Sequence, residues 1–198
     1  MTATFETSDP SPQRAQPSPW VQRYAPLVEP AGPVLDLAAG SGRHTIYFND
    51  LGHPVLAIDR DTSGLEDLRS RSGIEIMTLD LEAGDLAAGD LAAGGCWPLP
   101  GRSFAGIVVT NYLHRPLLAQ LAGALRPGGV LIYETFASGN ERFGRPSNPD
   151  FLLEPGELLD LARTSGLTVI AYEYGEVSQP KPAIIQHIVA KKYVGSIS

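Results

Sequence analysis

Short apolar runs alternate with amphipathic segments along most of the chain from Val34 onward. The runs lie between glycine- or proline-containing turns, as strands do, and the segments between them carry apolar residues at helical spacing. This alternation requires crossover connections, so it predicts an α/β fold with a mostly parallel sheet and helices on both faces. The expected strands are 34–37, 54–58, 74–78, 104–110, 130–135, 167–174 and 184–191, and the expected helices are 43–51, one that begins at 61–63, 114–125 and 155–164.

The two ends of the chain differ in pattern. Residues 1–18 are rich in Pro, Ser, Thr and Gln and contain few large apolar groups, so we expect a flexible tail. The remainder, 19–198, is expected to form one domain, which starts with a short helix around Trp20–Val28 and ends with an antiparallel pair of strands. A five-residue segment is repeated in tandem over 84–93, and we interpret it as an expanded surface loop.

Composition excludes several classes of function. The 198 residues carry a formal net charge of -7 and form no basic stripe, so direct binding of nucleic acid is not expected. No signal peptide, no apolar segment of membrane-spanning length and no metal-ligand spacing is visible. The single cysteine, Cys96, cannot form an internal disulfide. These features predict a cytoplasmic protein without a metal site, whose partner is a small molecule.

The segment from Val34 to Thr45 carries the strongest chemical signal. A buried strand runs into a turn of small residues and then into a helix. Gly40 and Gly42 allow the backbone to approach a ligand closely, and the helix that follows begins with unpaired N–H groups. This arrangement is typical of a nucleotide-cofactor site at the carboxyl end of a central strand.

Acidic residues indicate which cofactor this is. A dinucleotide fingerprint needs Gly or Ala where the chain has Thr45, and an anionic pyrophosphate gains nothing from Asp36. S-adenosylmethionine (SAM) instead carries an ammonium and a sulfonium, which a carboxylate at Asp36 suits. Asp59, followed by Arg60, ends the second strand, where a carboxylate can accept hydrogen bonds from ribose hydroxyls.

The end of the third strand offers a contact for the base. Asp80 can accept a hydrogen bond from the adenine amino group while Leu81 packs on the ring. The alternative for Asp80 is that it caps a turn before the expanded loop.

Because of this glycine loop and these acidic residues, the chain resembles the Rossmann-fold SAM-dependent methyltransferases over about Val34 to Lys191. The family's acidic glycine-rich loop is matched by 36–42, with Ala38 at the first glycine, and its post-strand signature is matched by 125–129. Within the family, 42–48 and 52–55 resemble the tellurite-resistance branch. The resemblance implies a seven-stranded sheet in the order 3-2-1-4-5-7-6 with the last strand antiparallel. It also implies SAM as cofactor, with Asp59 on the ribose and Asp80 on the adenine.

The segment after the fourth strand is the candidate acceptor site. Asn111 is expected to hydrogen-bond cofactor or substrate, Tyr112 to wall the pocket, and His114 to act as a general base. The alternative is that Asn111 caps the following helix and His114 lies in its exposed first turn. A soft nucleophile needs positioning and no base, so both schemes stay open.

The polar loop after the fifth strand is a candidate lid. Arg142, together with Arg145, is placed to hold an anionic substrate, and Phe143 to close the site against water. The alternative is a surface loop with solvated arginines. The function predicted from these residues is transfer of the SAM methyl group to a small-molecule acceptor. Three alternatives remain: a non-catalytic SAM-binding regulatory module, an RNA methyltransferase that acts with a partner, and a nicotinamide-dependent oxidoreductase.

Overall fold

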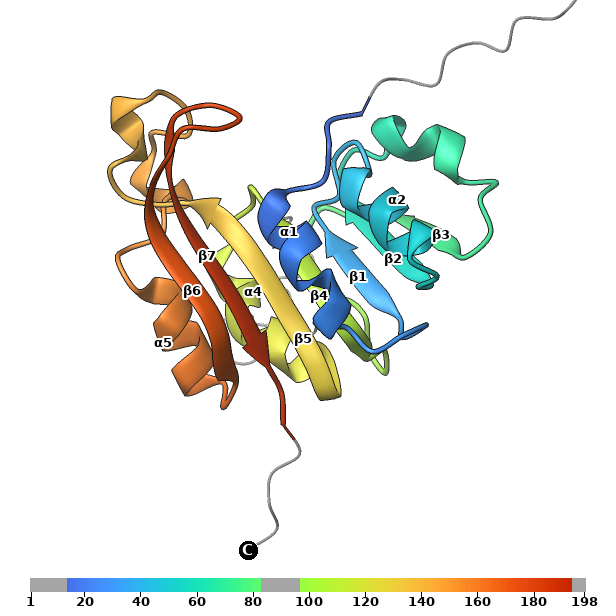
Figure 1. Ribbon diagram of the computed structural model, residues 1–198. Coiled ribbons are helices and arrows are strands. Elements are labelled where there is room, and N and C mark those ends of the chain that lie inside the picture. Colours follow the sequence, from blue (N-terminus) through green and yellow to red (C-terminus); the bar gives the residue numbers. More distant parts are fainter. Residues whose placement is uncertain (1–13, 83–96, 194–198) are drawn as a thin grey trace, which may run out of the picture.

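In the computed structural model, seven strands form one sheet in the order β3-β2-β1-β4-β5-β7-β6 (Figure 1). The structure describes residues 14–82 and 97–193. Neighbouring strands are parallel except for β7, which is antiparallel to both β5 and β6. The predicted order and the antiparallel last strand are therefore confirmed. The strands are β1 (Val34–Leu37), β2 (Val55–Asp59), β3 (Ile74–Thr78), β4 (Phe104–Thr110), β5 (Leu125–Phe136), β6 (Thr168–Val177) and β7 (Ala183–Lys191).

Helices cover both faces of this sheet. Figure 1 shows α1 and α2 on one face and α4 and α5 on the other. An apolar core therefore forms on each face of the sheet, because alternate residues of each strand point to opposite faces. Leu35 packs with α4 and α5, whereas Val34 packs with Trp20 of α1 and Phe48 of α2. The α-helices are α1 (Pro19–Tyr24), α2 (Arg43–Asp50), α4 (Arg115–Ala124) and α5 (Glu157–Thr164), and the 3-10 helices are η1 (Ala25–Leu27), η2 (Ser63–Leu68), η4 (Asn140–Arg142) and η5 (Pro149–Phe151).

Three predicted elements differ from the structure in type or extent. The helix expected to begin at 61–63 is the 3-10 helix η2, although it buries Leu65 and Leu68 as its pattern predicts. The segment 126–129, expected as a turn, belongs to β5, since Gly128 N–H donates to the Lys192 carbonyl at 2.6 Å. Helix α5 begins after Pro155, because Gly156 at its N-cap has a φ of +83°.

The expected flexible tail, residues 1–18, differs from the structure where the structure describes it, at 14–18. Residues 14–18 pack on the domain, and the Ser18 side chain caps α1 by accepting from Trp20 N–H. Sequence composition could not reveal this, because the contacts that hold the segment come from distant parts of the chain. Residues 1–13 and the tandem repeat at 84–93 lie outside the described residues. No helix within 14–82 and 97–193 is both long and apolar enough to cross a membrane.

Candidate functional site

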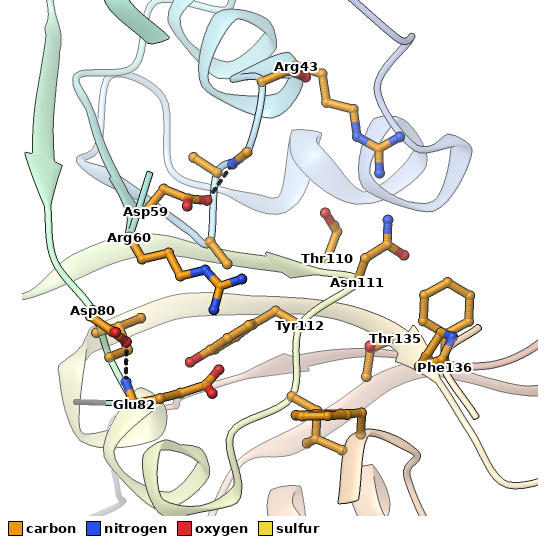
Figure 2. A pocket seen from close by; sticks show the side chains of 18 of the residues that line it. Arg43, Asp59, Arg60, Asp80, Glu82, Thr110, Asn111, Tyr112, Thr135 and Phe136 are labelled. Carbon is orange, nitrogen blue, oxygen red and sulfur yellow. Dashed lines mark hydrogen bonds between the residues drawn. The ribbon is translucent and has the colours of Figure 1, made fainter. Parts of the chain in front are cut away.

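A cavity of about 640 Å³ opens at the carboxyl ends of the central strands (Figure 2). Its walls come from the segments that follow β1, β2, β3, β4 and β5, so it lies where ligands bind in open α/β sheets. The volume is within the range of small-molecule and cofactor sites. The lining residues are Ala15, Ala38, Ala39, Gly40, Ser41, Arg43, Asp59, Arg60, Leu79, Asp80, Leu81, Glu82, Thr110, Asn111, Tyr112, Leu113, Thr135, Phe136, Pro146 and Phe151.

The loop after β1 forms the floor of this cavity. Ala38 and Gly40 both line it, and each has a φ of +56°. Gly40 adopts this left-handed conformation without strain, whereas the same conformation at Ala38 costs about 1–2 kcal/mol. Ala38 therefore holds the loop in a conformation that glycine would adopt more easily.

Gly42 is excluded from the cavity. A Cβ added at Gly42 would lie 2.6 Å from Leu65 and 2.9 Å from Leu68, and its φ is +76°. Its missing side chain makes room for η2 under the loop, which is a packing role. We expected Gly42 to face a ligand, but in the structure it faces η2 and does not line the cavity.

Asp36 also lies away from the cavity. It points to the face of the sheet that α2 covers, where it is buried and accepts a hydrogen bond from Thr45 Oγ1 at 2.6 Å. Burial raises the pKa of Asp36 to about 6, an effect that the Thr45 hydrogen bonds oppose. The carboxylate expected to face the SAM ammonium instead fastens α2 to β1, because its strand position sends it to the covered face.

Replacing Thr45 by valine is expected to lower the free energy of unfolding by about 1–3 kcal/mol, because a buried carboxylate loses its donor. Since the folded state holds a proton on Asp36 between 3.8 and about 6, stability from this group is present at low pH and lost as pH rises through that window. Thr45→Val raises the pKa further, so its cost should be larger at pH 8 than at pH 5. Urea unfolding at both pH values measures this, and an equal cost at both would contradict the assigned hydrogen bond.

Asp59 joins the loop to the end of β2 and faces the cavity. Its Oδ2 accepts from Gly40 N–H at 2.8 Å and its Oδ1 from Asp61 N–H at 3.0 Å. A carboxylate has about four acceptor positions, so two remain for a ligand. Asp59 thus fixes the loop and presents an acceptor pair at the same time.

The end of the cavity beside β3 is lined by Asp80, Leu81 and Glu82. Asp80 Oδ1 accepts from Glu82 N–H at 2.9 Å, so it caps a turn and lines the cavity as well. Figure 2 shows the Tyr112 hydroxyl on this side, where burial raises its pKa. Its Oη is buried and has no hydrogen-bond partner among the described residues. Tyr112 is therefore oriented toward the β3 end of the cavity, whereas we expected it to wall the acceptor site. Arg60 points to the same end.

Asn111 stands at the opposite end of the cavity. It has a φ of +55°, and its N–H donates to the Glu134 carbonyl at 3.0 Å. Asparagine tolerates this conformation better than most residues, and such strain tends to gather at functional sites. Figure 2 shows Asn111 next to Thr110 and near Phe136.

Four more of the predicted residues do not line the cavity: His114, Arg142, Phe143 and Arg145. His114 precedes α4 at its N-cap and makes no capping hydrogen bond through its side chain. Arg142 is exposed and lies 3.7 Å from Glu176, and its guanidinium covers the ring of Phe143, which is 40% exposed. The loop after β5 reaches the cavity further along, through Pro146.

The N-terminal segment 14–18 completes the site. Its part in the site was not predicted from the sequence. Arg14 donates to the carbonyls of Ser41 and Gly64 and to Asp67, so it clamps the cavity loop to η2. Ala15 lines the cavity directly. At the far end of the segment, the Ser18 hydroxyl donates to the Glu134 carboxylate at 2.7 Å.

His44 connects this segment to the cavity. Its Nε2 accepts from Ser18 N–H at 3.1 Å, and its Nδ1 lies 3.4 Å from Thr110 Oγ1. Burial lowers the pKa of His44 to about 3, so the ring is neutral and its proton is on Nδ1. When Nδ1–H donates to Thr110, the Thr110 hydroxyl is left to donate its own proton into the cavity. Within the residues described, no cluster of His, Cys, Asp and Glu has the geometry of a metal site.

Comparison with known proteins gives matches in structure alone. No family model matches the chain, and no curated protein sequence matches it either. Among solved structures, TehB from Haemophilus influenzae has a TM-score of 0.65 at 18% identity over 87% of this chain and 61% of that one. The 1,6-didemethyltoxoflavin-N1-methyltransferase of Burkholderia thailandensis was solved with S-adenosylhomocysteine. It has a TM-score of 0.62 at 22% identity, and the match covers 88% of this chain and 76% of that one.

The fold is that of the SAM-dependent methyltransferases. This methyltransferase fold agrees with the resemblance expected from the sequence, including the likeness to TehB. The chain spans about three fifths of the TehB chain, 61%. The same fold occurs in the [4+2]-cyclase SpnF, with a TM-score of 0.64 at 13% identity over 89% of this chain and 79% of that one.

Proposed function

We propose that this protein binds SAM and transfers its methyl group to a small-molecule acceptor. The observation that carries the proposal is the pair of carboxylates at the ends of β2 and β3, Asp59 and Asp80, which line one cavity with the Ala38–Gly40 loop. Asp59 has acceptor positions left for both ribose hydroxyls, and Asp80 lies beside Leu81 for the adenine.

A dinucleotide is a poorer match for this cavity. The helix that follows the loop carries Thr45, which is fully buried and bonded to Asp36, where the dinucleotide fingerprint has a glycine or alanine. The lining also places three carboxylates, those of Asp59, Asp80 and Glu82, where a diphosphate would add negative charge. These features favour a cationic, phosphate-free nucleoside.

The other end of the cavity supplies positions for an acceptor. Thr110, Asn111 and Thr135 offer hydroxyl and amide groups, and Phe136 and Phe151 offer apolar walls. The described lining contains no histidine, so positioning of the nucleophile against the methyl group is the contribution that this chain's residues make. SAM, when bound, supplies the electrophilic methyl. The cavity volume of about 640 Å³ and the net charge of -7 favour a small acceptor over a nucleic acid.

The fold does not fix the reaction, since SpnF shares it and is a cyclase. The test must therefore follow the methyl group itself. The protein is incubated with methyl-labelled SAM and pools of small nucleophiles, and label in a product together with released S-adenosylhomocysteine is measured. Label transfer that Asp59→Ala abolishes is the expected result. Tight SAM binding with no transfer to any acceptor class would favour a non-catalytic SAM-binding module.

A further inference from the structure

The end of the cavity beside β4 and β5 holds no group that would take a proton from an acceptor. Figure 2 shows Thr110, Asn111, Thr135 and Phe136 at this end. The lining carboxylates follow β2 and β3 at the other end, and the described lining contains no histidine. An acceptor bound beside β4 and β5 must therefore have a nucleophilic atom that carries no proton at neutral pH.

A buried histidine sets the direction of the hydrogen bond at Thr110. The Ser18 N–H can only donate, so His44 Nε2, which accepts from it at 3.1 Å, carries no proton. The ring proton is then on Nδ1, which lies 3.4 Å from Thr110 Oγ1 and donates to it. The hydroxyl of Thr110 makes no other hydrogen bond with the described residues, so its own proton is available to an oxygen in the cavity. His44 thereby makes Thr110 a donor.

Aromatic side chains form the walls beside this donor. Phe136 ends β5, Phe151 ends η5, and both line the cavity together with Pro146. Phe151 is 46% exposed, although the two leucines that follow it, Leu152 and Leu153, are buried. A large apolar side chain left exposed in the wall of a cavity favours a ligand with an apolar body that covers it. A planar ring suits these walls best, because aromatic pairs gain more than their buried area alone provides.

We propose that the acceptor is an aromatic carboxylate, and that His44 is the positioning residue that selects it through Thr110. This inference rests on the proposed function. A carboxyl group with a pKa of about 4 is ionised at neutral pH, so it needs no base, and it can only accept a hydrogen bond. One carboxylate oxygen accepts from the Thr110 hydroxyl while the other is held against the methyl carbon of SAM.

Methyl transfer to a carboxylate balances without a proton. The C–O bond of a methyl ester forms as the C–S bond of the sulfonium breaks, and the electron pair of the broken bond stays on sulfur. The carboxylate loses its negative charge and the sulfonium its positive charge. The products are a neutral ester and S-adenosylhomocysteine, so the absence of a base from this end of the described lining does not hinder the reaction.

The test titrates two probes of similar shape into the complex with S-adenosylhomocysteine. The charged group of benzoate only accepts hydrogen bonds, whereas that of protonated benzamidine only donates them. The unmodified protein should bind benzoate at least about 10-fold more tightly than benzamidine, as measured by calorimetry. Thr110→Val should weaken benzoate by about 10-fold, and Thr110→Ser, which keeps the hydroxyl, should stay within about 2-fold.

Thr164→Val is the matched control, because Thr164 is exposed on α5 and its hydroxyl donates to the Asp160 carbonyl. It should change the affinity for neither probe.

The role of His44 is tested by its tautomer and by substitution. Nitrogen NMR of the unmodified protein at neutral pH should show a proton on Nδ1 of His44 and none on Nε2. His44→Asn keeps an N–H donor near the Nδ1 position and should hold benzoate within about 3-fold, whereas His44→Phe should lose the preference for benzoate over benzamidine. A purely structural role would lower stability in both variants and leave that preference unchanged.

Four results would each overturn the proposal: a ring proton on Nε2, no binding of benzoate to the complex, equal binding of the two probes, or an unchanged benzoate affinity in Thr110→Val. If the unmodified protein does not bind S-adenosylhomocysteine, the proposed function itself fails, which separates the two failures.

Discussion

Replacing Asp59 by alanine is expected to weaken S-adenosylhomocysteine binding by about 100-fold, because the ligand loses two charge-assisted hydrogen bonds from its ribose. The change also removes the acceptor of Gly40 N–H, which lies 2.8 Å from Asp59 Oδ2 and holds the floor of the cavity. Asp59→Asn keeps one oxygen for Gly40 and should therefore lose less affinity than Asp59→Ala. Calorimetric titration of the three proteins gives the comparison.

Asp61 provides the control for this experiment. It lies two residues away, is exposed, and accepts from Ser63 N–H at 3.0 Å without lining the cavity. Asp61→Asn should leave the affinity unchanged within about 2-fold, since no ligand contact is lost. An Asp59→Ala protein that binds as well as the Asp61→Asn protein would remove Asp59 from the ribose site.

Gly42→Ala is expected to have the largest effect on stability, a loss of about 2–5 kcal/mol in the free energy of unfolding. The new Cβ would lie 2.6 Å from Leu65 and 2.9 Å from Leu68, and Gly42 has a φ of +76°. The left-handed conformation costs alanine about 1–2 kcal/mol, and overpacking against η2 adds about 1–3 kcal/mol. Urea denaturation followed by circular dichroism measures the loss.

Gly40→Ala separates the two contributions to that loss. Gly40 has a φ of +56°, but nothing lies within 4 Å of its added Cβ. Only the conformational cost should appear, about 1–2 kcal/mol. If both variants lost the same stability, packing against Leu65 and Leu68 would not explain why position 42 is glycine.

The sequence was sufficient for the sheet because its information is local and periodic. The run 106–109 is continuously apolar and 34–37 is interrupted only by Asp36, as expected of strands buried on both faces, and the glycines and prolines between the elements mark their ends. The strand order came from the resemblance to a family, since periodicity does not determine which strands are neighbours. The type of η2 was missed because its apolar pair suits an α-helix equally well.

Site residues that lie at the end of a strand could be predicted from the sequence. Site residues that are placed by contacts with distant parts of the chain could not. Asp59 and Asp80 reach the cavity because the carboxyl ends of parallel strands share one edge. Asp36 lies earlier in its strand, so alternation sends it to the face under α2. Arg43, Phe151 and the 14–18 segment enter the site through contacts between remote parts of the chain, such as Ser18 with Glu134. The Ser18-Pro19 pair, a helix-start signature, was the one local signal for that segment.

The central claim is that carboxylates at the ends of β2 and β3 select a phosphate-free adenosine nucleoside. The most direct test is a calorimetric titration of the folded, full-length protein with S-adenosylhomocysteine and, separately, with NAD. We expect saturable binding of S-adenosylhomocysteine with a Kd in the micromolar range and no displacement by NAD. No heat with S-adenosylhomocysteine at high micromolar concentration, or preferential binding of NAD, would contradict it.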